Sequence, residues 1–163
     1  MSFVVRDATR DDLPAMHQLV VELAVFEREP DAVTADLEHY RQNFADGVFR
    51  GLVAVTPEGV VVGMAIFYIT FSTWKGRCVY LEDLVVTEKW RRHGVGRALF
   101  AQLLVRAQDL RCKLVRFAVL DWNEPAISFY RKLGASISNE WLSVRLEAPF
   151  NNVMNVNVNV TEL

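Results

Sequence analysis

The chain has 163 residues, of which 52% are hydrophobic, 11% aromatic and 23% charged, and its formal net charge at pH 7 is −2. This length suits one compact domain with a full hydrophobic core, so we expect a single domain over residues 1–163 and exclude disorder for most of the chain. Basic and acidic residues are interspersed along the sequence, which gives no electrostatic footprint for a nucleic acid or an anionic membrane partner.

The N-terminal part of the chain is typical of one strand and two helices. Residues 3–6 are expected to form a short strand. Residues 8–27 are expected to form an amphipathic helix, because apolar side chains recur there near the 3.6-residue period. A second helix is expected over residues 34–44, with Thr34 as its N-cap.

Three strands follow in the sequence. Residues 49–55 and residues 60–71 are separated by the turn "TPEG", which predicts a β-hairpin. Residues 77–86 are expected to add a third antiparallel strand.

The C-terminal half returns to a helical pattern and then alternates. One helix is predicted by an apolar face that comprises Val95, Leu99, Leu103, Ala107 and Leu110. It is followed by a strand over residues 114–120, a short helix over residues 125–133 that ends at Gly134, and a last strand over residues 143–147. This order predicts an α/β (α+β) domain.

The tail over residues 150–163 alternates asparagine with apolar residues. Its period of two favours an extra strand, whereas the poor β propensity of asparagine favours a loose tail, and both alternatives stay open.

Membrane, disulfide and metal-binding proteins are disfavoured by this sequence. The apolar run over residues 60–71 is too short to span about 30 Å of hydrocarbon as a helix. The N-terminus lacks the features of a signal peptide, so we expect a cytoplasmic protein. Cys78 and Cys112 form no CxxC pair and are expected to be reduced core residues. His17, His39 and His93 fit no metal-ligand spacing, so no metal is expected.

A basic, glycine-containing loop follows the third antiparallel strand. Arg91, Gly94 and Gly96 form the pattern R-x-x-G-x-G at the start of a helix, and Arg92 and Arg97 add positive charge. The free N–H groups and dipole of a helix N-terminus favour an anion such as a pyrophosphate. Taken alone, such a loop is a plain tight turn at least as often.

Two carboxylates, Glu82 and Asp83, lie in the strand just before this loop. Because successive side chains of a strand alternate, we expect the pair to point to opposite faces, so that at most one joins the hydrophobic side and at least one could face a cleft. On the pair alone, a solvated strand end is the alternative. Further on, Asn123 is expected to cap the helix that Pro125 begins, and Tyr130 lies in its following turns.

These segments together resemble the GNAT superfamily of acyl-CoA-dependent N-acetyltransferases. Over residues 3–147 the chain is similar to the spermidine/spermine (diamine) N-acetyltransferase group in the segments "ELAVFE", "STWKGR", "YLEDLVV", "WRRHGVGRAL" and "AVLDWNEPAISFYRKLGA". "STWKGR" and "AVLDWN" are more similar to the branch that acetylates thialysine. The polyamine branch has an acidic residue before the matching tryptophan, where this chain has Ser72 and Thr73 before Trp74.

The resemblance implies a GNAT fold with a central mixed, mostly antiparallel twisted sheet of six to seven strands flanked by about four helices. It also implies an enzyme that uses acetyl-CoA as co-substrate and needs no metal. The primary amine of a small molecule would attack the acetyl thioester directly in a ternary complex. A homodimer is implied as well. The implied acetyl-CoA-binding residues are Leu84, Val85, Val86, Arg91, Arg92, His93, Gly94, Val95, Gly96, Arg97, Asn123 and Tyr130.

By the same resemblance, Tyr130 protonates the departing thiolate and Glu82 helps to remove a proton from the amine through water. The implied acceptor-binding residues are Phe26, Glu27, Trp74, Glu82 and Asp83. Proton removal is needed because an amine with a pKa of about 10.4 is almost fully protonated at neutral pH, and nearby carboxylates hold it so.

Two alternatives stay open on the sequence. The acceptor could be another amine, such as an amino acid, an antibiotic or a protein lysine, or the domain could bind acyl-CoA without catalysis. Glu82 and Tyr130 together argue against the second alternative, because binding CoA alone requires neither an acid nor a proton donor.

Overall fold

The computed structural model describes residues 1–148. The chain clusters into two compact units, Met1–Ala118 and Val119–Leu163. A single domain over residues 1–163 therefore stays a prediction. The tail over residues 150–163, for which two alternatives were open, lies outside the described residues.

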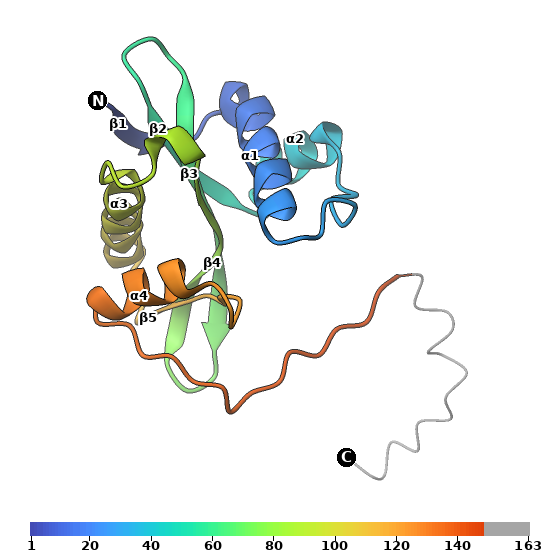
Figure 1. Cartoon of the computed structure of the whole chain (residues 1–163). Coiled ribbons are helices and arrows are strands. Elements are labelled where there is room, and N and C mark those ends of the chain that lie inside the picture. Colours follow the sequence, from blue (N-terminus) through green and yellow to red (C-terminus); the bar gives the residue numbers. More distant parts are fainter. Residues whose placement is uncertain (149–163) are drawn as a thin grey trace. The chain divides into compact units, whose positions relative to one another are not determined.

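The first unit contains a five-stranded mixed sheet (Figure 1). Its strands, in the order in which they pair, are β1 Val4–Asp7, β2 Arg50–Val55, β3 Val61–Ser72, β4 Gly76–Val86 and β5 Leu114–Arg116. Strands β1 to β4 pair antiparallel with one another, and β5 pairs parallel with β4. The predicted α/β class and the hairpin of β2 and β3 are thus confirmed.

Helices cover both faces of this sheet. Figure 1 shows α1 (Leu13–Phe26) and α2 (Leu37–Ala45) on one side and α3 (Val95–Asp109) on the other. Helix α2 begins later than predicted because Asp36, rather than Thr34, is its N-cap and accepts a hydrogen bond from the backbone N–H of His39. The second unit contains α4 (Glu124–Lys132), which was predicted over residues 125–133.

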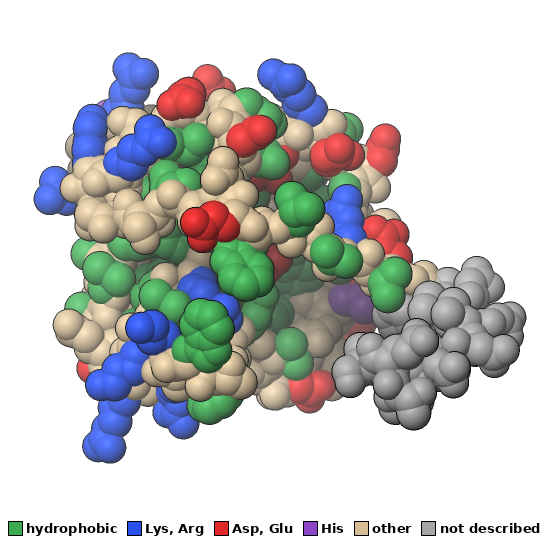
Figure 2. Space-filling model, turned by 90° about the horizontal axis from the view of Figure 1, so that it is seen from below, with side chains coloured by type: hydrophobic (Ala, Val, Ile, Leu, Met, Phe, Trp, Pro, Cys, Tyr) green, Lys and Arg blue, Asp and Glu red, His purple; other side chains and the backbone are tan. Residues whose placement is uncertain are grey.

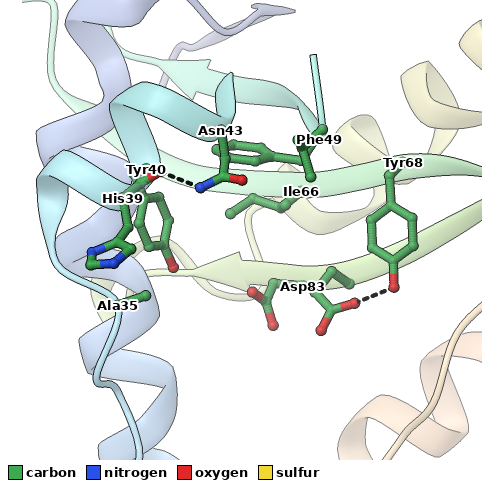
Figure 3. A pocket seen from close by; sticks show the side chains of 10 residues that line it. Ala35, His39, Tyr40, Asn43, Phe49, Ile66, Tyr68 and Asp83 are labelled. Atoms are coloured by element: carbon green, nitrogen blue, oxygen red, sulfur yellow. Dashed lines mark hydrogen bonds between the residues drawn. The ribbon is translucent and has the colours of Figure 1, made fainter. Parts of the chain in front are cut away.

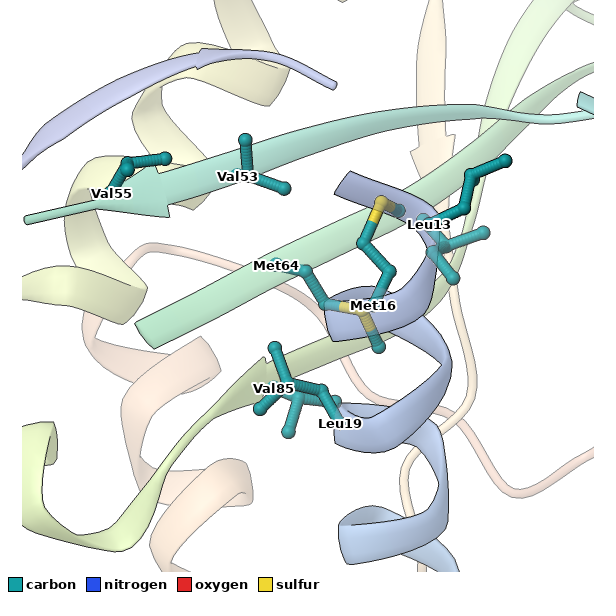
Figure 4. Close-up of a cluster of buried hydrophobic side chains, with 8 residues drawn as sticks. Leu13, Met16, Leu19, Val53, Val55, Met64 and Val85 are labelled. Atoms are coloured by element: carbon teal, nitrogen blue, oxygen red, sulfur yellow. The ribbon is translucent and has the colours of Figure 1, made fainter. Parts of the chain in front are cut away.

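The core between α1 and the sheet is apolar and closely packed (Figure 4). Leu13 and Met16 of α1 are fully buried against the sheet residues Val53, Met64 and Val85. Burying each such side chain contributes about 1.5–3 kcal/mol, so this face fixes α1 on the sheet.

Helix α3 packs on the opposite face through the predicted apolar residues. Val95, Leu99, Leu103 and Ala107 are buried, and Leu110 lies at the C-cap, just past the helix. Gly63 of β3 permits this contact, because a Cβ there would lie 3.0 Å from the Val85 backbone oxygen and 3.0 Å from Val95 Cγ1.

The sheet of the described residues has five strands rather than six to seven. The last predicted strand, residues 143–147, is not paired in the structure, and its apolar side chains are exposed, with Val144 88% exposed. The predicted strand over residues 114–120 is shortened to β5. An alternating pattern forms a strand only where a partner supplies backbone hydrogen bonds, and the sequence pattern cannot show where pairing ends.

Two further sequence expectations concern membrane-spanning helices and the cysteines. No helix within residues 1–148 is long and apolar enough to cross a membrane. Cys78 is buried and Cys112 is half-buried, and both are free thiols. Figure 2 shows hydrophobic, basic and acidic side chains beside one another on one face of the molecule.

Candidate active site

The acidic pair lies at an irregularity of strand β4. In its pairing with β3, Asp83 lies opposite Ile66 and Leu81 lies opposite Phe67, so Glu82 has no partner residue. Such an extra residue is a β-bulge, which interrupts the alternation of side chains. Glu82 and Asp83 consequently line the same pocket. The expectation that they point to opposite faces is wrong, because it assumed a regular strand.

This pocket has a volume of about 330 Å³ and lies between α2 and the strands β3 and β4 (Figure 3). Its apolar walls include Tyr40, Phe49 and Ile66, and Figure 3 shows Tyr40 and Tyr68 on opposite sides of Asp83. Aromatic rings beside carboxylates suit an alkylammonium group, whose carbon chain contacts the rings and whose charge interacts with both.

The electrostatics of the pocket favour a cation. Burial, followed by the charges of Glu82 and Glu27, raises the pKa of Asp83 from 3.8 to about 6. Burial also raises the pKa of Glu27. The pKa of Tyr40 is raised by burial and then by the charges of Asp83 and Glu82. Three carboxylates thus act on one small region, and a bound cation would relieve their repulsion.

The remaining predicted acceptor residues lie outside the pocket lining. Phe26 ends α1, and its ring lies 5.5 Å from the guanidinium carbon of Arg91. Trp74 is 85% exposed in the turn between β3 and β4. Of the five predicted residues, Glu82 and Asp83 line the pocket, and Glu27 acts on it through its charge.

The structure adds pocket residues that sequence reasoning missed. Helix α2 contributes His39, Tyr40 and Asn43, and the sheet side contributes Phe49 and Tyr68. The apolar periodicity of residues 34–44 predicted that helix, but a periodic face is the same whether it packs only on a core or also borders a cavity.

Strand β4 has an open edge beyond Tyr80. Strand β5 pairs with Cys78, Val79 and Tyr80 alone, and no other strand of the described chain pairs with that edge. The part of β4 beyond Tyr80 includes the three predicted residues Leu84, Val85 and Val86, whose side chains are buried or half-buried. Unpaired backbone groups on a strand edge can bind an extended ligand in the manner of an added strand.

The loop after β4 forms the N-terminus of α3 in a conformation suited to an anion. Gly94, with φ 83°, occupies the N-cap position, and Arg92 has the unusual φ of 64°. Within the described chain, the first turn of α3 contains no acidic residue and no side chain caps it. Its N–H groups and dipole therefore stay available to a phosphate, with Arg91, Arg92 and Arg97 nearby in sequence.

Two local contacts define the shape of this loop. The Nε–H group of Arg91 donates to the backbone oxygen of Val86 at 3.0 Å, which ties the loop to the end of β4. His93 Nδ1 lies 2.8 Å from the backbone oxygen of Arg91. At Gly96 an added Cβ would lie 3.7 Å from Val86 Cγ2, an ordinary contact. Packing therefore does not require glycine there.

Asn123 and Tyr130 belong to the second unit, which begins at Val119. The Asn123 side chain caps α4 and accepts a hydrogen bond from the backbone N–H of Ala126 at 3.3 Å, as predicted. Tyr130 is 8% exposed, and burial raises its pKa to about 12. Its hydroxyl therefore stays protonated at neutral pH.

Within residues 1–148, no group of three or more His, Cys, Asp or Glu side chains is arranged to hold a metal ion. The first unit therefore contains a carboxylate-lined pocket suited to a cation and a helix N-terminus suited to an anion.

Comparison with known proteins assigns this arrangement to a family. The model of the acetyltransferase (GNAT) family matches residues 13–135. The chain belongs to the GNAT acetyltransferase family. It is 37% identical to thialysine N-epsilon-acetyltransferase of Bos taurus over 90% of this chain and 94% of that protein. It is also 34% identical to spermidine/spermine N(1)-acetyltransferase-like protein 1 of Homo sapiens over 82% of this chain and 20% of that protein.

A solved structure confirms the GNAT fold. An aminoglycoside acetyltransferase from an uncultured soil metagenomic sample superimposes with a TM-score of 0.76 at 20% identity, over 89% of this chain and 97% of that chain. The resemblance to the diamine N-acetyltransferase group and to its thialysine-acetylating branch is likewise confirmed. This GNAT protein is an N-acetyltransferase that acetylates an amine.

Proposed function

We propose that this GNAT enzyme transfers acetyl from acetyl-CoA to the primary amine of a small thialysine-like or diamine molecule, by direct attack in a ternary complex. The observation that carries this proposal is the β-bulge of β4, which directs two adjacent carboxylates into one aromatic pocket. Such a pocket suits an alkylammonium substrate better than a neutral or anionic one.

The acceptor end must both attract a cation and remove its proton. At neutral pH only about one in 2,500 molecules of a primary amine is the free base that can attack. In this proposal Asp83 and Glu27 attract the ammonium, and Glu82 takes up its proton, directly or through water. Phe26 and Trp74 lie outside the pocket lining, and a role for them in acceptor binding stays a prediction.

The donor end is the N-terminus of α3 and the open edge of β4. When bound, acetyl-CoA supplies an activated acetyl thioester. The N–H groups of residues 94–97, with Arg91 and Arg92, would hold its pyrophosphate. The backbone of residues 84–86 would pair with its pantetheine arm, and Asn123 would make a further contact.

Tyr130 is the proposed proton donor to the departing thiolate. With the pKa of Tyr130 at about 12 and that of a thiol near 8.5, donation is uphill by about 3.5 units, or roughly 5 kcal/mol. Hydrogen-bond donors and dipoles that are already oriented in a dry site can supply stabilisation of this size. The cysteines lie outside these motifs, which favours direct attack over an acetyl-cysteine route.

The turn before Trp74 favours a short substrate over a long polycation. Ser72 Oγ accepts hydrogen bonds from the backbone N–H groups of Trp74 and Lys75, so it stabilises the turn. A carboxylate at this turn could pair with a distant ammonium, and the turn has none. We therefore favour thialysine over spermidine as the acceptor. Homodimerisation and a cytoplasmic location stay predictions from the sequence.

The test measures CoA release from acetyl-CoA with a panel of thialysine, lysine, ornithine, a diamine and spermidine. We expect kcat/KM for thialysine to exceed that for spermidine by at least about tenfold. This is the effect of one hydrogen bond to a charged group, which the distant ammonium of spermidine would lack here. Glu82→Gln should reduce kcat by about 100-fold, the usual contribution of a general base, whereas Glu58→Gln in the exposed turn between β2 and β3 should not change it. Tight acetyl-CoA binding without CoA release on any amine would instead indicate a non-catalytic acyl-CoA-binding module.

A further inference from the structure

Tyr68 is a pocket residue outside every motif that carries the family resemblance. Its hydroxyl donates a hydrogen bond to Glu82 Oε2 at 2.8 Å, across from β3 to β4 (Figure 3). Glu82 is the extra residue of the bulge and has no partner in the ladder. The Tyr68 hydroxyl thus holds the Glu82 carboxylate at the position of β4 where regular strand pairing does not determine the direction of the side chain.

Tyr68 is itself held in place by the sheet. It lies opposite Tyr80 in the β3–β4 register, and the two rings stack with centroids 5.3 Å apart and planes inclined by 25°. Burial, followed by the hydrogen bond to Glu82, raises the pKa of Tyr68 to about 12. The hydroxyl therefore keeps its proton and donates throughout the neutral range.

We propose that Tyr68 is a positioning residue for acetyl transfer, whose hydroxyl orients the Glu82 carboxylate in the pocket and stabilises its ionised form. This inference rests on the proposed role of Glu82 as the group that takes up the proton of the amine. A hydrogen bond donated to a carboxylate favours the charged form, which is the form that can accept a proton.

The hydrogen bond also distinguishes the two adjacent acids. Burial and the charge of Glu82 oppose the ionised form of Asp83, whereas Glu82 has a phenol donor. Two neighbouring carboxylates with different surroundings can divide their work, one to bind and the other to accept a proton. Among the described residues, the charges of Glu27 after α1, Tyr80 on β4 and Arg116 on β5 act on Asp83 or Tyr68, and His39 and Tyr40 of α2 line the same pocket.

The test compares Tyr68→Phe with the matched control Tyr80→Phe, which keeps both stacked rings and the hydroxyl of Tyr68. In Tyr68→Phe we expect kcat/KM for the amine to fall about tenfold and the acidic limb of its pH profile to move up by about one unit. Tyr80→Phe should leave the acidic limb where it lies in the wild type. Far-UV circular dichroism and Tm confirm that both variants fold.

A second measurement tests the role of Tyr68 independently of the proposed function, because it requires no catalytic turnover. In protein labelled with ¹³C at glutamate carboxyls, the Glu82 resonance is assigned by its loss in Glu82→Gln. The proposal expects the chemical shift of this resonance at pH 7.5 to change in Tyr68→Phe, because the carboxylate loses its phenol donor, and to stay at the wild-type value in Tyr80→Phe. An unchanged chemical shift and an unchanged acidic limb overturn it. A changed chemical shift in a protein that acetylates no amine upholds the effect of Tyr68 on Glu82 and refutes the proposed function.

Discussion

Replacement of Asp83 by asparagine should stabilise the fold at neutral pH while impairing the enzyme. The pKa of Asp83 is raised from 3.8 to about 6, first by burial and then by the charges of Glu82 and Glu27. A raised carboxyl pKa means that the native state disfavours the charged form, so ionisation of Asp83 destabilises the fold. This cost is absent below pH 3.8, grows as the pH rises towards 6, and is complete above that value.

The size of the effect follows from the pKa difference. A rise from 3.8 to about 6 corresponds to about 3 kcal/mol at pH 7.5, and to about 1 kcal/mol at pH 4.5, where the carboxyl is largely protonated in the native state. Asparagine has nearly the shape of the protonated acid but no charge. Asp83→Asn should therefore gain about 3 kcal/mol in free energy of unfolding at pH 7.5 and about 2 kcal/mol less than that at pH 4.5.

The assay is urea denaturation of the wild type, Asp83→Asn and the control Asp31→Asn at both pH values. Asp31 is exposed in the segment between α1 and α2, and its replacement should change the free energy of unfolding by less than about 0.5 kcal/mol. The same proteins should show a higher KM for the amine in Asp83→Asn alone. A loss of stability at pH 7.5, or an equal gain at both pH values, would refute the reasoning, because it would show that Asp83 carries no penalty for ionisation.

Three further predictions concern packing, an ion pair and the proton donor. Gly63→Ala should lower the free energy of unfolding by about 1–3 kcal/mol, because the new methyl would lie 3.0 Å from Val95 Cγ1; no change in thermal denaturation would contradict this. Arg6 pairs with the buried Asp12 and holds its pKa at about 2, so Asp12→Asn should cost about 2 kcal/mol at pH 7. That deficit should shrink as the pH falls from about 4 through 2, whereas a pH-independent deficit would exclude the ion pair as its cause. Tyr130→Phe should lower kcat far more than it raises KM for acetyl-CoA, and an unchanged kcat would remove Tyr130 from catalysis.

The sequence was sufficient for the local elements of the first unit. The periodicity of residues 95–109 predicted the face of α3 that is buried, because a helix repeats its contacts every 3.6 residues wherever it packs. The turn "TPEG" predicted the hairpin of β2 and β3 for an equally local reason. The prediction of a strand over residues 143–147 was wrong, because a strand depends on a pairing partner that its own residues do not specify.

The features of the candidate site likewise separate into those that neighbouring residues determine and those that tertiary structure determines. The loop at Gly94 was readable from the sequence, since a glycine before a helix and the free N–H groups behind it are properties of neighbouring residues. The shared direction of Glu82 and Asp83, the wall that α2 supplies and the hydrogen bond from Tyr68 were decided by tertiary structure. The direction of the two carboxylates and the hydrogen bond from Tyr68 depend on how β3 pairs with β4, because a bulge of one residue in that pairing reverses the face to which a side chain points.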